Sequence, residues 1–520
     1  MITSTFSVRT SMVSAIATLG LAVLAAWAAP QEARAQLVPI SDLSPYPDGG
    51  DPNDPAAVTQ CNGGPQGGVV YRNSETEPYI AVNPTDPENM IAAWHQDRWS
   101  TGGGQGLGAA YSFDGGASWT QVNIPFTRCS GGAPRSAGDF ERASDPWISF
   151  SPDGTAHYMA LVFNDSISAN GMAAASSSDG GVTWSEPVPI TISPARDPVL
   201  ASLFHDKNSF TADPVDSDLI YATWTLFRLG STTLLFSRST DGGQRWTHAR
   251  PVNNFEMSPP PNLVTFRQGA QIVVLPDGTL VNAFFRFGVN QRTGQGFLDQ
   301  AIFRSTDQGR HWELRDTRVA ELFTAVAFDP ELGVPVRDAG ELPDIAVNRT
   351  TGDLYIAWQD TRFNSGLVGV VVARSTDGGD TWSAPVPVNR VAGVKAFLPS
   401  VSVNAEGTVG VLFYDFRNDV LGDPVLSTDI HLARFDPDLT LQDEVPVTPE
   451  SFDLRQSVIT GSRGYFPGDY VGLDTAGNDF VAAVTVTNPL GLPVDFPQDN
   501  SGLAVDANNR QDIVFARVTP

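Results

Sequence analysis

The stretch Ser375-Thr376-Asp377-Gly378-Gly379-Asp380-Thr381-Trp382 reads STDGGDTW, and close variants of it occur four times earlier in the chain. The variants are SFDGGASW (112–119), SSDGGVTW (177–184), STDGGQRW (239–246) and STDQGRHW (305–312). Successive copies are 65, 62, 66 and 70 residues apart, as measured between their aspartates Asp114, Asp179, Asp241, Asp307 and Asp377. Five copies at a nearly constant period predict a fold made of repeated units.

Each octet has the composition of a tight turn between two antiparallel strands. An aspartate accepts hydrogen bonds from backbone N–H groups just ahead of it, and the glycines supply positive φ. The residues before the octets, such as 370–373 (VVVA), have the composition of a strand. We therefore expect the five aspartates to hold turns and to take no part in chemistry.

The pattern S-x-D-x-G-x-x-W resembles the Asp-box repeat of bacterial sialidases and their relatives. The resemblance covers residues 69–520 and implies an all-β fold, a β-propeller of four-stranded antiparallel blades. A second repeat, a short first strand followed by a turn, occurs seven times, from 78–84 (PYIAVNP) to 469–474 (DYVGLD). It favours seven blades, and six blades are the alternative. Residues 69–72 are expected to supply the fourth strand of the last blade and so to close the ring.

The first 35 residues have the pattern of a cleavable signal peptide. Arg9 precedes an apolar run over 12–29, and Ala33-Arg34-Ala35 fits a cleavage site. An uncleaved anchor is the alternative. We expect a secreted or periplasmic protein that is not inserted in a membrane after cleavage, with a Pro/Gly-rich N-terminal segment at 36–68 before the propeller. Cys61 and Cys129 are the only cysteines, and the sequence leaves open whether they pair.

The composition limits the partners. A formal net charge of −26 argues against nucleic acid and against anionic membrane surfaces, so any anion site must be a local arginine cluster. No Cys/His cluster suggests zinc, and no cofactor is expected; structural Ca²⁺ held by ring carboxylates is kept as an alternative. We expect a monomer whose partner is a glycan or glycoconjugate.

The loops opposite the octets carry aspartates and arginines. They include 95–98 (HQDR), Arg286, 360–362 (DTR) and 415–417 (DFR). Arginines that converge on one face can bind a carboxylate in bidentate fashion. Alternatively, each arginine pairs with its neighbouring aspartate and holds its own loop. For any single residue this second interpretation is favoured.

The resemblance to sialidases implies three arginines that bind the sugar carboxylate, a Tyr nucleophile assisted by Glu, and an Asp acid/base. Arg286 ends a stretch similar to the one that carries a triad arginine, and Tyr470 is similar in place to the nucleophile. Glu341 or Asp469 would assist Tyr470, and the acid/base would be Asp97, Asp145 or Asp206. The further substrate-binding candidates are Arg98, Arg362, Arg417 and Arg463.

These residues favour an exo-glycosidase that hydrolyses a terminal acidic sugar of the sialic acid type from glycans. The alternative is a non-catalytic Asp-box propeller that binds glycan, cell-wall material or protein. Two departures from the family pattern support the alternative. The family's Arg-Ile-Pro near the start of the propeller is absent, and Gln268-Gly269-Ala270 stand where its glutamate is expected. The sequence therefore leaves open whether the protein is an enzyme.

Overall fold

The computed structural model describes residues 37–46, 61, 67–165, 169–194, 203–228, 231–252, 263–460, 464–488 and 511–520. The expected signal peptide and Arg463 lie outside these residues. The described residues belong to one compact unit, Arg34–Pro520. None of its described helices is long and apolar enough to cross a membrane. Cys61 is disulfide-bonded to Cys129, which answers the question that the sequence left open.

The unit is a β-propeller of antiparallel sheets. Three sheets contain four strands in chain order. They are β11 (Phe204–Ala212), β12 (Leu219–Arg228), β13 (Ser231–Thr240), β14 (Arg250–Pro251); β15 (Leu263–Val274), β16 (Leu280–Asn290), β17 (Gly296–Ser305), β18 (Thr317–Glu321); and β19 (Asp344–Val347), β20 (Leu354–Asp360), β21 (Gly369–Ser375), β22 (Val386–Pro387). A fourth sheet contains β23 (Ala396–Val403), β24 (Val409–Asp415), β25 (Ser427–Phe435), β26 (Leu441–Pro446) and, on β25, the short β27 (Phe452–Asp453), which precedes a 3-10 turn at Leu454–Gln456.

Two expected blades are merged in one nine-stranded sheet. Its strands are β2 (Val70–Tyr71), β3 (Thr76–Asn83), β4 (Asp86–Trp99), β5 (Gly104–Ser112), β6 (Thr120–Asn123), β7 (Arg142–Phe150), β8 (Ala156–Phe163), β9 (Asn170–Ser177) and β10 (Val188–Ser193). A single residue pair, Gly104 with Ala143, joins β5 to β7. Because the pairings merge these units, seven blades remain a prediction.

The last sheet corrects the predicted ring closure. It contains β28 (Gly472–Ala476), β29 (Asp479–Thr487), β30 (Gln511–Val518) and, as its fourth strand, β1 (Val38–Pro39). The expectation that residues 69–72 would close the ring was wrong, since β2 pairs with Arg98 and Trp99 of β4. The long β4 extends beyond its pairing with β3 and offers β2 a free edge. The closing strand β1 lies inside the segment 36–68.

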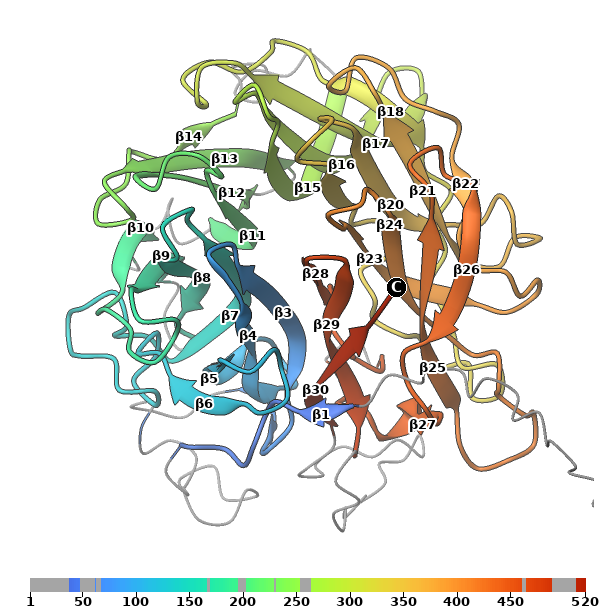
Figure 1. Cartoon of the computed structure of the whole chain (residues 1–520), viewed down its shortest axis with the longest axis horizontal. Helices are drawn as coiled ribbons and strands as arrows, with labels where there is room; N and C mark the ends of the chain where they lie inside the picture. The colour runs from blue at the N-terminus through green and yellow to red at the C-terminus, as the bar shows by residue number, and fades with distance from the viewer. Residues whose placement is uncertain are drawn as a thin grey trace, which may run out of the picture. The chain divides into compact units, whose positions relative to one another are not determined.

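The first strands of the sheets surround a common centre (Figure 1). They contact one another in the closed series β3–β7–β11–β15–β19–β23–β28–β3. The hydrophobic core lies between neighbouring sheets. For example, Val281 and Ile302 of the β15–β18 sheet share a cluster with Ile356 and Val371 of the β19–β22 sheet. Strands such as β20 are buried along their whole length because apolar neighbours cover both faces.

The octets join third to fourth strands, as the sequence predicts. In the last copy, the Asp377 carboxylate accepts hydrogen bonds from the Ser375 hydroxyl at 2.8 Å and from the Thr381 N–H at 2.9 Å. The Ser375 hydroxyl in turn accepts the N–H of Gly379 at 2.9 Å. The other four copies repeat these contacts. The octet aspartates therefore hold turns at the end of the propeller that carries these connections.

Candidate functional site

The first strands carry a repeated β-bulge, at which the register against the second strand shifts. The backbone is left-handed there, with φ between 52° and 70°, at Glu77, Asp145, Lys207, Gly269 and Leu398. Glycine adopts this conformation freely, whereas for other residues it costs roughly 1–3 kcal/mol. Strained backbone concentrates at functional sites. The three charged bulge residues, on the successive first strands β3, β7 and β11, therefore mark the candidate site.

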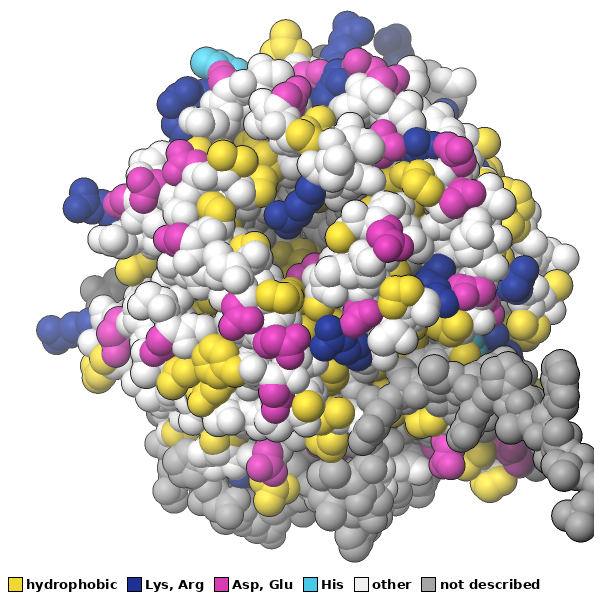
Figure 2. Space-filling model, in the orientation of Figure 1, with side chains coloured by type: hydrophobic (Ala, Val, Ile, Leu, Met, Phe, Trp, Pro, Cys, Tyr) yellow, Lys and Arg dark blue, Asp and Glu magenta, His cyan; other side chains and the backbone are white. Residues whose placement is uncertain are grey.

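These residues line a polar cavity of about 500 Å³, called the cleft below. Its charged lining residues are Glu77, Arg98, Asp145, Asp165, Asp206, Lys207 and Arg337. One face of the unit, drawn in Figure 2, has acidic and basic side chains interspersed over it and is hollowed near its centre. Recognition of a charged ligand therefore depends on local groups such as those in the cleft and not on a field of one sign.

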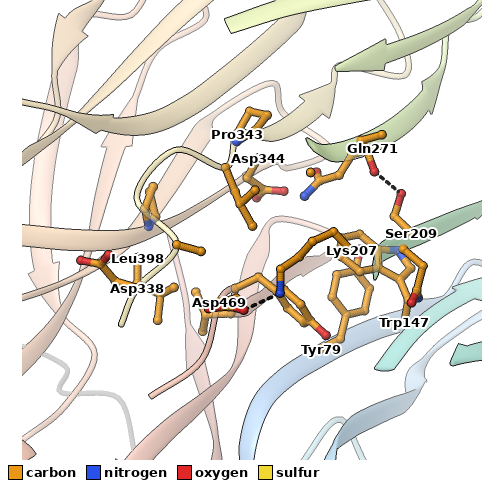
Figure 3. Close-up of a pocket in the computed structure, with 18 residues that line it drawn as sticks. Tyr79, Trp147, Lys207, Ser209, Gln271, Asp338, Pro343, Asp344, Leu398 and Asp469 are labelled. Carbon is orange, nitrogen blue, oxygen red and sulfur yellow. Dashed lines mark hydrogen bonds and ion pairs between the residues drawn. The ribbon is translucent and has the colours of Figure 1, made fainter. Parts of the chain in front are cut away.

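Asp469 lies between two cations at the edge of the cleft. Lys207 Nζ contacts its Oδ2, as Figure 3 shows, and Arg337 donates to its two oxygens at 3.1 and 2.7 Å. Burial opposes the charge on Asp469, but Lys207 and Arg337 outweigh it and hold the pKa of Asp469 well below its usual range. Lys207 Nζ also lies 3.9 Å from Asp145 Oδ2. Lys207 thus connects two carboxylates.

Asp145 and Asp206 form a pair of carboxyl groups at one amide. The Lys207 N–H lies 3.0 Å from Asp145 Oδ2 and 2.9 Å from Asp206 Oδ1, so both oxygens are acceptors at the same nitrogen. The Ser144 hydroxyl donates to the other oxygen of Asp145 at 2.7 Å. Burial raises the pKa of Asp206 to about 7, with Lys207 opposing this shift and the charges of Asp145 and Asp469 adding to it. Burial therefore favours the protonated form of Asp206.

Glu77 and His95 support this pair from behind. His95 Nε2 lies 2.7 Å from Glu77 Oε2 and accepts the Asp145 N–H at 2.9 Å. The other oxygen of Glu77 accepts the Asp469 N–H at 3.1 Å. Burial opposes the charge of Glu77, but the contact with His95 lowers the pKa of Glu77 overall. These bonds fix the backbone on which both Asp145 and Asp469 sit.

Donor atoms of Glu77, His95 and Asp145 lie within 4.8 Å of one another, a spacing that a metal ion can bridge. The set contains an imidazole, whereas Ca²⁺ takes oxygen ligands, so it does not fit the calcium alternative. The facing nitrogen, His95 Nε2, already accepts the Asp145 N–H and lies 2.7 Å from Glu77 Oε2. We assign this cluster to positioning.

Two guanidinium groups that line the cleft lie against one buried aromatic ring. Arg98 Cζ and Arg337 Cζ lie 4.8 and 4.5 Å from the centroid of the Phe466 ring. Burial, followed by the charge of Arg337, lowers the pKa of Arg98 to about 10. Arg98 Nε is buried with no hydrogen-bond partner in the described part of the chain. Two like charges held together in this way favour an anionic ligand.

Sequence reasoning missed Arg337 as a site residue. It lies in the connection between β18 and β19, which is long for this fold and holds no strand among its described residues. Long connections of this kind often carry functional residues, and this was the available signal. The connection is held against the segment before β28, because the Arg337 N–H donates to the Tyr465 carbonyl at 2.8 Å and Arg455 pairs with Asp329 at 2.8 Å.

The other predicted arginines form local ion pairs and do not line the cleft. Arg286 pairs with Asp299 at 2.9 Å and with Asp316. Arg362 pairs with Asp360 at 2.8 Å, and Arg417 with Asp415 at 2.6 Å and Glu444 at 2.7 Å. The structure thus brings Arg98, Asp145 and Asp206 together from the predicted set, with Asp469 beside them, and leaves these three arginines apart.

Asp97 and Glu341 also lie outside the cleft lining. Asp97 accepts the Asn73 N–H at 2.8 Å and the Ser44 hydroxyl at 2.6 Å, which ties the N-terminal segment to β4. The Glu341 carbonyl accepts a hydrogen bond from Gln300 at 2.9 Å. These contacts hold the backbone near the centre of the propeller.

Tyr470 lines a second pocket, at the centre of the ring. Figure 3 shows side chains from several first strands converging there, including Tyr79, Trp147 and Lys207. The cavity is only about 30 Å³, close to the volume of one water molecule, so it does not hold a sugar. The Tyr470 hydroxyl lies 3.5 Å from the Pro146 carbonyl. Burial, followed by nearby carboxylates, raises the pKa of Tyr470 well above 10.

Comparisons with known proteins give similarity to solved structures only. No family model matches the chain, and no curated protein matches it. A Hadza microbial sialidase is 14% identical, with a TM-score of 0.45 over 84% of this chain and 75% of that one. An α-L-arabinanase of Penicillium chrysogenum complexed with arabinobiose is 12% identical, with a TM-score of 0.45 over 73% and 94%. A protein of unknown function from Dyadobacter fermentans is 13% identical, with a TM-score of 0.43 over 87% and 98%. Similarity at these levels does not assign an activity to this chain.

Proposed function

We propose that the protein is an exported exo-glycosidase that hydrolyses a terminal acidic sugar bound in the cleft. The proposal rests on one observation: a carboxyl pair and a guanidinium pair line the same cavity. Asp145 and Asp206 supply a carboxyl pair, and Arg98 and Arg337 supply a guanidinium pair. Glycoside hydrolysis commonly uses two carboxyl groups, one of which must be protonated at the working pH.

The guanidinium pair is the proposed carboxylate subsite. The Arg337 side chain is 38% exposed and binds Asp469 through Nε and Nη2. Its Nη1 has no hydrogen-bond partner among the described residues. In a chain of net charge −26, an anionic sugar needs a local cationic subsite, which this arrangement supplies. A volume of about 500 Å³ suits a small ligand such as a terminal sugar.

The resemblance to sialidases suggests sialic acid as the sugar, with Tyr470 as nucleophile, Glu341 as its partner and Arg286, Arg362 and Arg417 on the carboxylate. In our proposal Arg98 and Arg337 take the carboxylate instead, because they line the cleft and the other three do not. Asp206 serves as the proton donor. We also propose that the protein is secreted or periplasmic and that it is a monomer.

A non-catalytic glycan-binding propeller is the second candidate. The observation that favours it is the pairing of Lys207 and Arg337 with Asp469, which satisfies cations within the protein. A cleft of this kind can hold an acidic glycan without cleaving it.

The deciding experiment measures hydrolysis of aryl glycosides by the purified protein. The panel contains an α-sialoside, both anomers of a glucuronide and a galacturonide, and a neutral galactoside. We expect turnover of an acidic glycoside, none of the neutral one, and a clear fall of that turnover in Arg337→Gln at substrate concentrations below KM. Loss in Arg286→Gln but not in Arg337→Gln would favour the sialidase-type arginine set. Acidic-glycan binding without turnover would support the second candidate, and neither binding nor turnover would refute both.

A further inference from the structure

Resting on the proposed function, we infer that Asp145 is the nucleophile of a two-step hydrolysis that retains the anomeric configuration, with Asp206 as its acid and base, and that the cleft takes glycosides of uronic acids. Two observations carry the inference. One is the close approach of the two carboxyl groups at one amide, and the other is that Tyr470 lines the central pocket and not the cleft.

The spacing follows from the shared amide. Asp145 Oδ2 and Asp206 Oδ1 each lie within hydrogen-bond distance of the Lys207 nitrogen, so these two oxygens are at most about 6 Å apart. Inverting glycosidases keep their carboxyl groups roughly 6.5–9.5 Å apart to admit a water between sugar and base, and retaining enzymes keep them roughly 5–5.5 Å apart. The limit of about 6 Å between these two oxygens lies below the inverting range and is compatible with direct attack by one carboxylate.

Asp145 has the features of a fixed nucleophile. It lines the cleft and is 2% exposed, and its oxygens are held by the Ser144 hydroxyl and by the N–H of Lys207. The Lys207 ammonium lies 3.9 Å from its Oδ2. The bulge that forces φ to 54° fixes the direction of its side chain. A group fixed in this way is oriented for attack before substrate binds.

Tyr470 lacks these features. It lines the central pocket of about 30 Å³ and is absent from the cleft lining. No cation pairs with its hydroxyl among the described residues: Lys207 lines the same pocket but binds Asp469, and the carboxylates Glu77, Asp145 and Asp469 raise the pKa of Tyr470 further after burial. A tyrosine surrounded by carboxylates keeps its proton and is a poor nucleophile.

The proposed hydrolysis has two chemical steps. An Asp145 carboxylate oxygen bonds to the anomeric carbon while the glycosidic C–O bond breaks, and the leaving oxygen takes the proton of the Asp206 carboxyl group. Water then attacks the anomeric carbon as the bond to Asp145 breaks. The Asp206 carboxylate takes the proton of this water, and both groups return to their starting states.

The choice of nucleophile decides the class of acidic sugar. A sialoside carries its carboxylate on the anomeric carbon itself, so an attacking Asp145 carboxylate would meet a like charge within bonding distance in a partly buried site. A uronic acid carries its carboxylate on the far side of the ring oxygen. Its anomeric carbon can face Asp145 while its carboxylate faces Arg98 and Arg337.

The test uses the full-length protein and three readouts. Proton NMR during turnover of the preferred aryl uronoside should show first a product with the anomeric configuration of the substrate. Incubation with 2-deoxy-2-fluoro-uronosyl fluorides should add one sugar mass, and peptide mapping should place it on Asp145. Asp145→Gly suits the left-handed backbone, and added azide should restore turnover and yield a glycosyl azide of the opposite configuration.

Gln308→Gly is the matched control. Gln308 also has a left-handed backbone, with φ 59°, but lies in an octet where the other four copies carry glycine. The Gln308→Gly variant should keep the activity of the wild type and should still be labelled by the fluorosugar. An inverted product, a sugar on Tyr470, or turnover of the sialoside alone would overturn the inference while the proposed function stands. Absence of turnover on every acidic glycoside would overturn both.

Discussion

The octet turns and the cleft use the same residue types in opposite ways. In an octet, the aspartate binds groups two residues before it and four residues after it. In the cleft, Lys207 and Asp469 are 262 residues apart in sequence, Arg337 and Asp469 are 132 apart, and Asp145 and Lys207 are 62 apart. An octet is therefore complete within eight residues, whereas the cleft exists only when the ring has formed.

Arginines show the same contrast. On four third strands an arginine reaches the turn between the third and fourth strands of the next sheet, and the recipients include the Gln308 carbonyl for Arg238 at 2.7 Å and the Gly115 carbonyl for Arg517 at 3.1 Å. Arg304 and Arg374 make equivalent contacts, and Arg434 reaches the Thr519 carbonyl beyond the third strand of the next sheet. The octet-end arginines thus join neighbouring blades. In the cleft, Arg98 and Arg337 lie against the same ring, Phe466, and two like charges held there favour an anionic ligand.

Removing one aspartate from each region should produce the largest difference. Asp206→Asn should lower kcat by roughly 10²–10⁴-fold on a glycoside with a poor leaving group, because the proton donor is lost. The loss should be much smaller with a 2,4-dinitrophenyl leaving group, which needs no proton. Asp377→Asn should leave kcat unchanged and lower the free energy of unfolding by about 1–2 kcal/mol through lost hydrogen bonds. Steady-state kinetics and urea unfolding measure the two effects.

Equal losses of Asp206→Asn on both leaving groups would show that Asp206 is not the acid. A loss of activity in Asp377→Asn without unfolding would remove the separation between the two regions. Asp206→Glu, which keeps the acid but lengthens the side chain, should restore part of the activity on the poor leaving group.

The contrast also explains what the sequence could predict. The hydrogen bonds of an octet lie within its own eight residues, so this short pattern was enough to predict the turns, the all-β fold and the end of the propeller at which the octets lie. The loops with Asp and Arg were predicted on the opposite side, but their partners were not. Arg362 and Arg417 each pair with an aspartate two residues away and Arg286 pairs with Asp299 on the neighbouring strand, whereas Arg337 reaches Asp469 through a long connection that has no repeat pattern. Ring closure by β1 was missed for the same reason, since its pairing with β30 spans nearly the whole chain.

The guanidinium pair should control affinity more than turnover. Arg337→Gln should raise KM for an acidic glycoside by roughly 10–100-fold, because a charge-assisted hydrogen bond to the sugar carboxylate is lost. Its kcat should change less, since Asp145 and Asp206 keep their partners. Arg434→Gln, at the octet end, is the matched control and should leave KM unchanged. Added salt should raise KM for the wild type and have little effect on the variant. A fall in kcat alone would place Arg337 in the chemistry and not in binding.

The smallest expected effect is an opposite dependence of stability on pH in the two regions. Hydrogen bonds from the Thr381 hydroxyl and N–H lower the pKa of Asp377 to about 2, so its contribution is present above the unfolded pKa near 4 and is lost as pH falls through about 2. Burial raises the pKa of Asp206 to about 7, so its contribution is present below pH 4 and is lost as pH rises through 7. Burial also raises the pKa of Asp338 to about 7 and the pKa of Asp344 to about 6. Their contributions to stability are lost as pH rises, in the same direction as that of Asp206.

Thermal unfolding from pH 2 to pH 9 should therefore show a maximum of Tm between about pH 4 and 5. Asp206→Asn should flatten the alkaline side, because an amide cannot ionise in the cleft, and Asp377→Asn should flatten the acid side. The octet effect should be the weaker of the two, since Asp377 is close to solvent and water screens its interactions. If Asp206→Asn left the alkaline side unchanged, Asp206 would already be ionised at neutral pH. The carboxyl pair would then lack the proton that the leaving group needs, and the aspartates of the cleft, like those of the octets, would only accept hydrogen bonds.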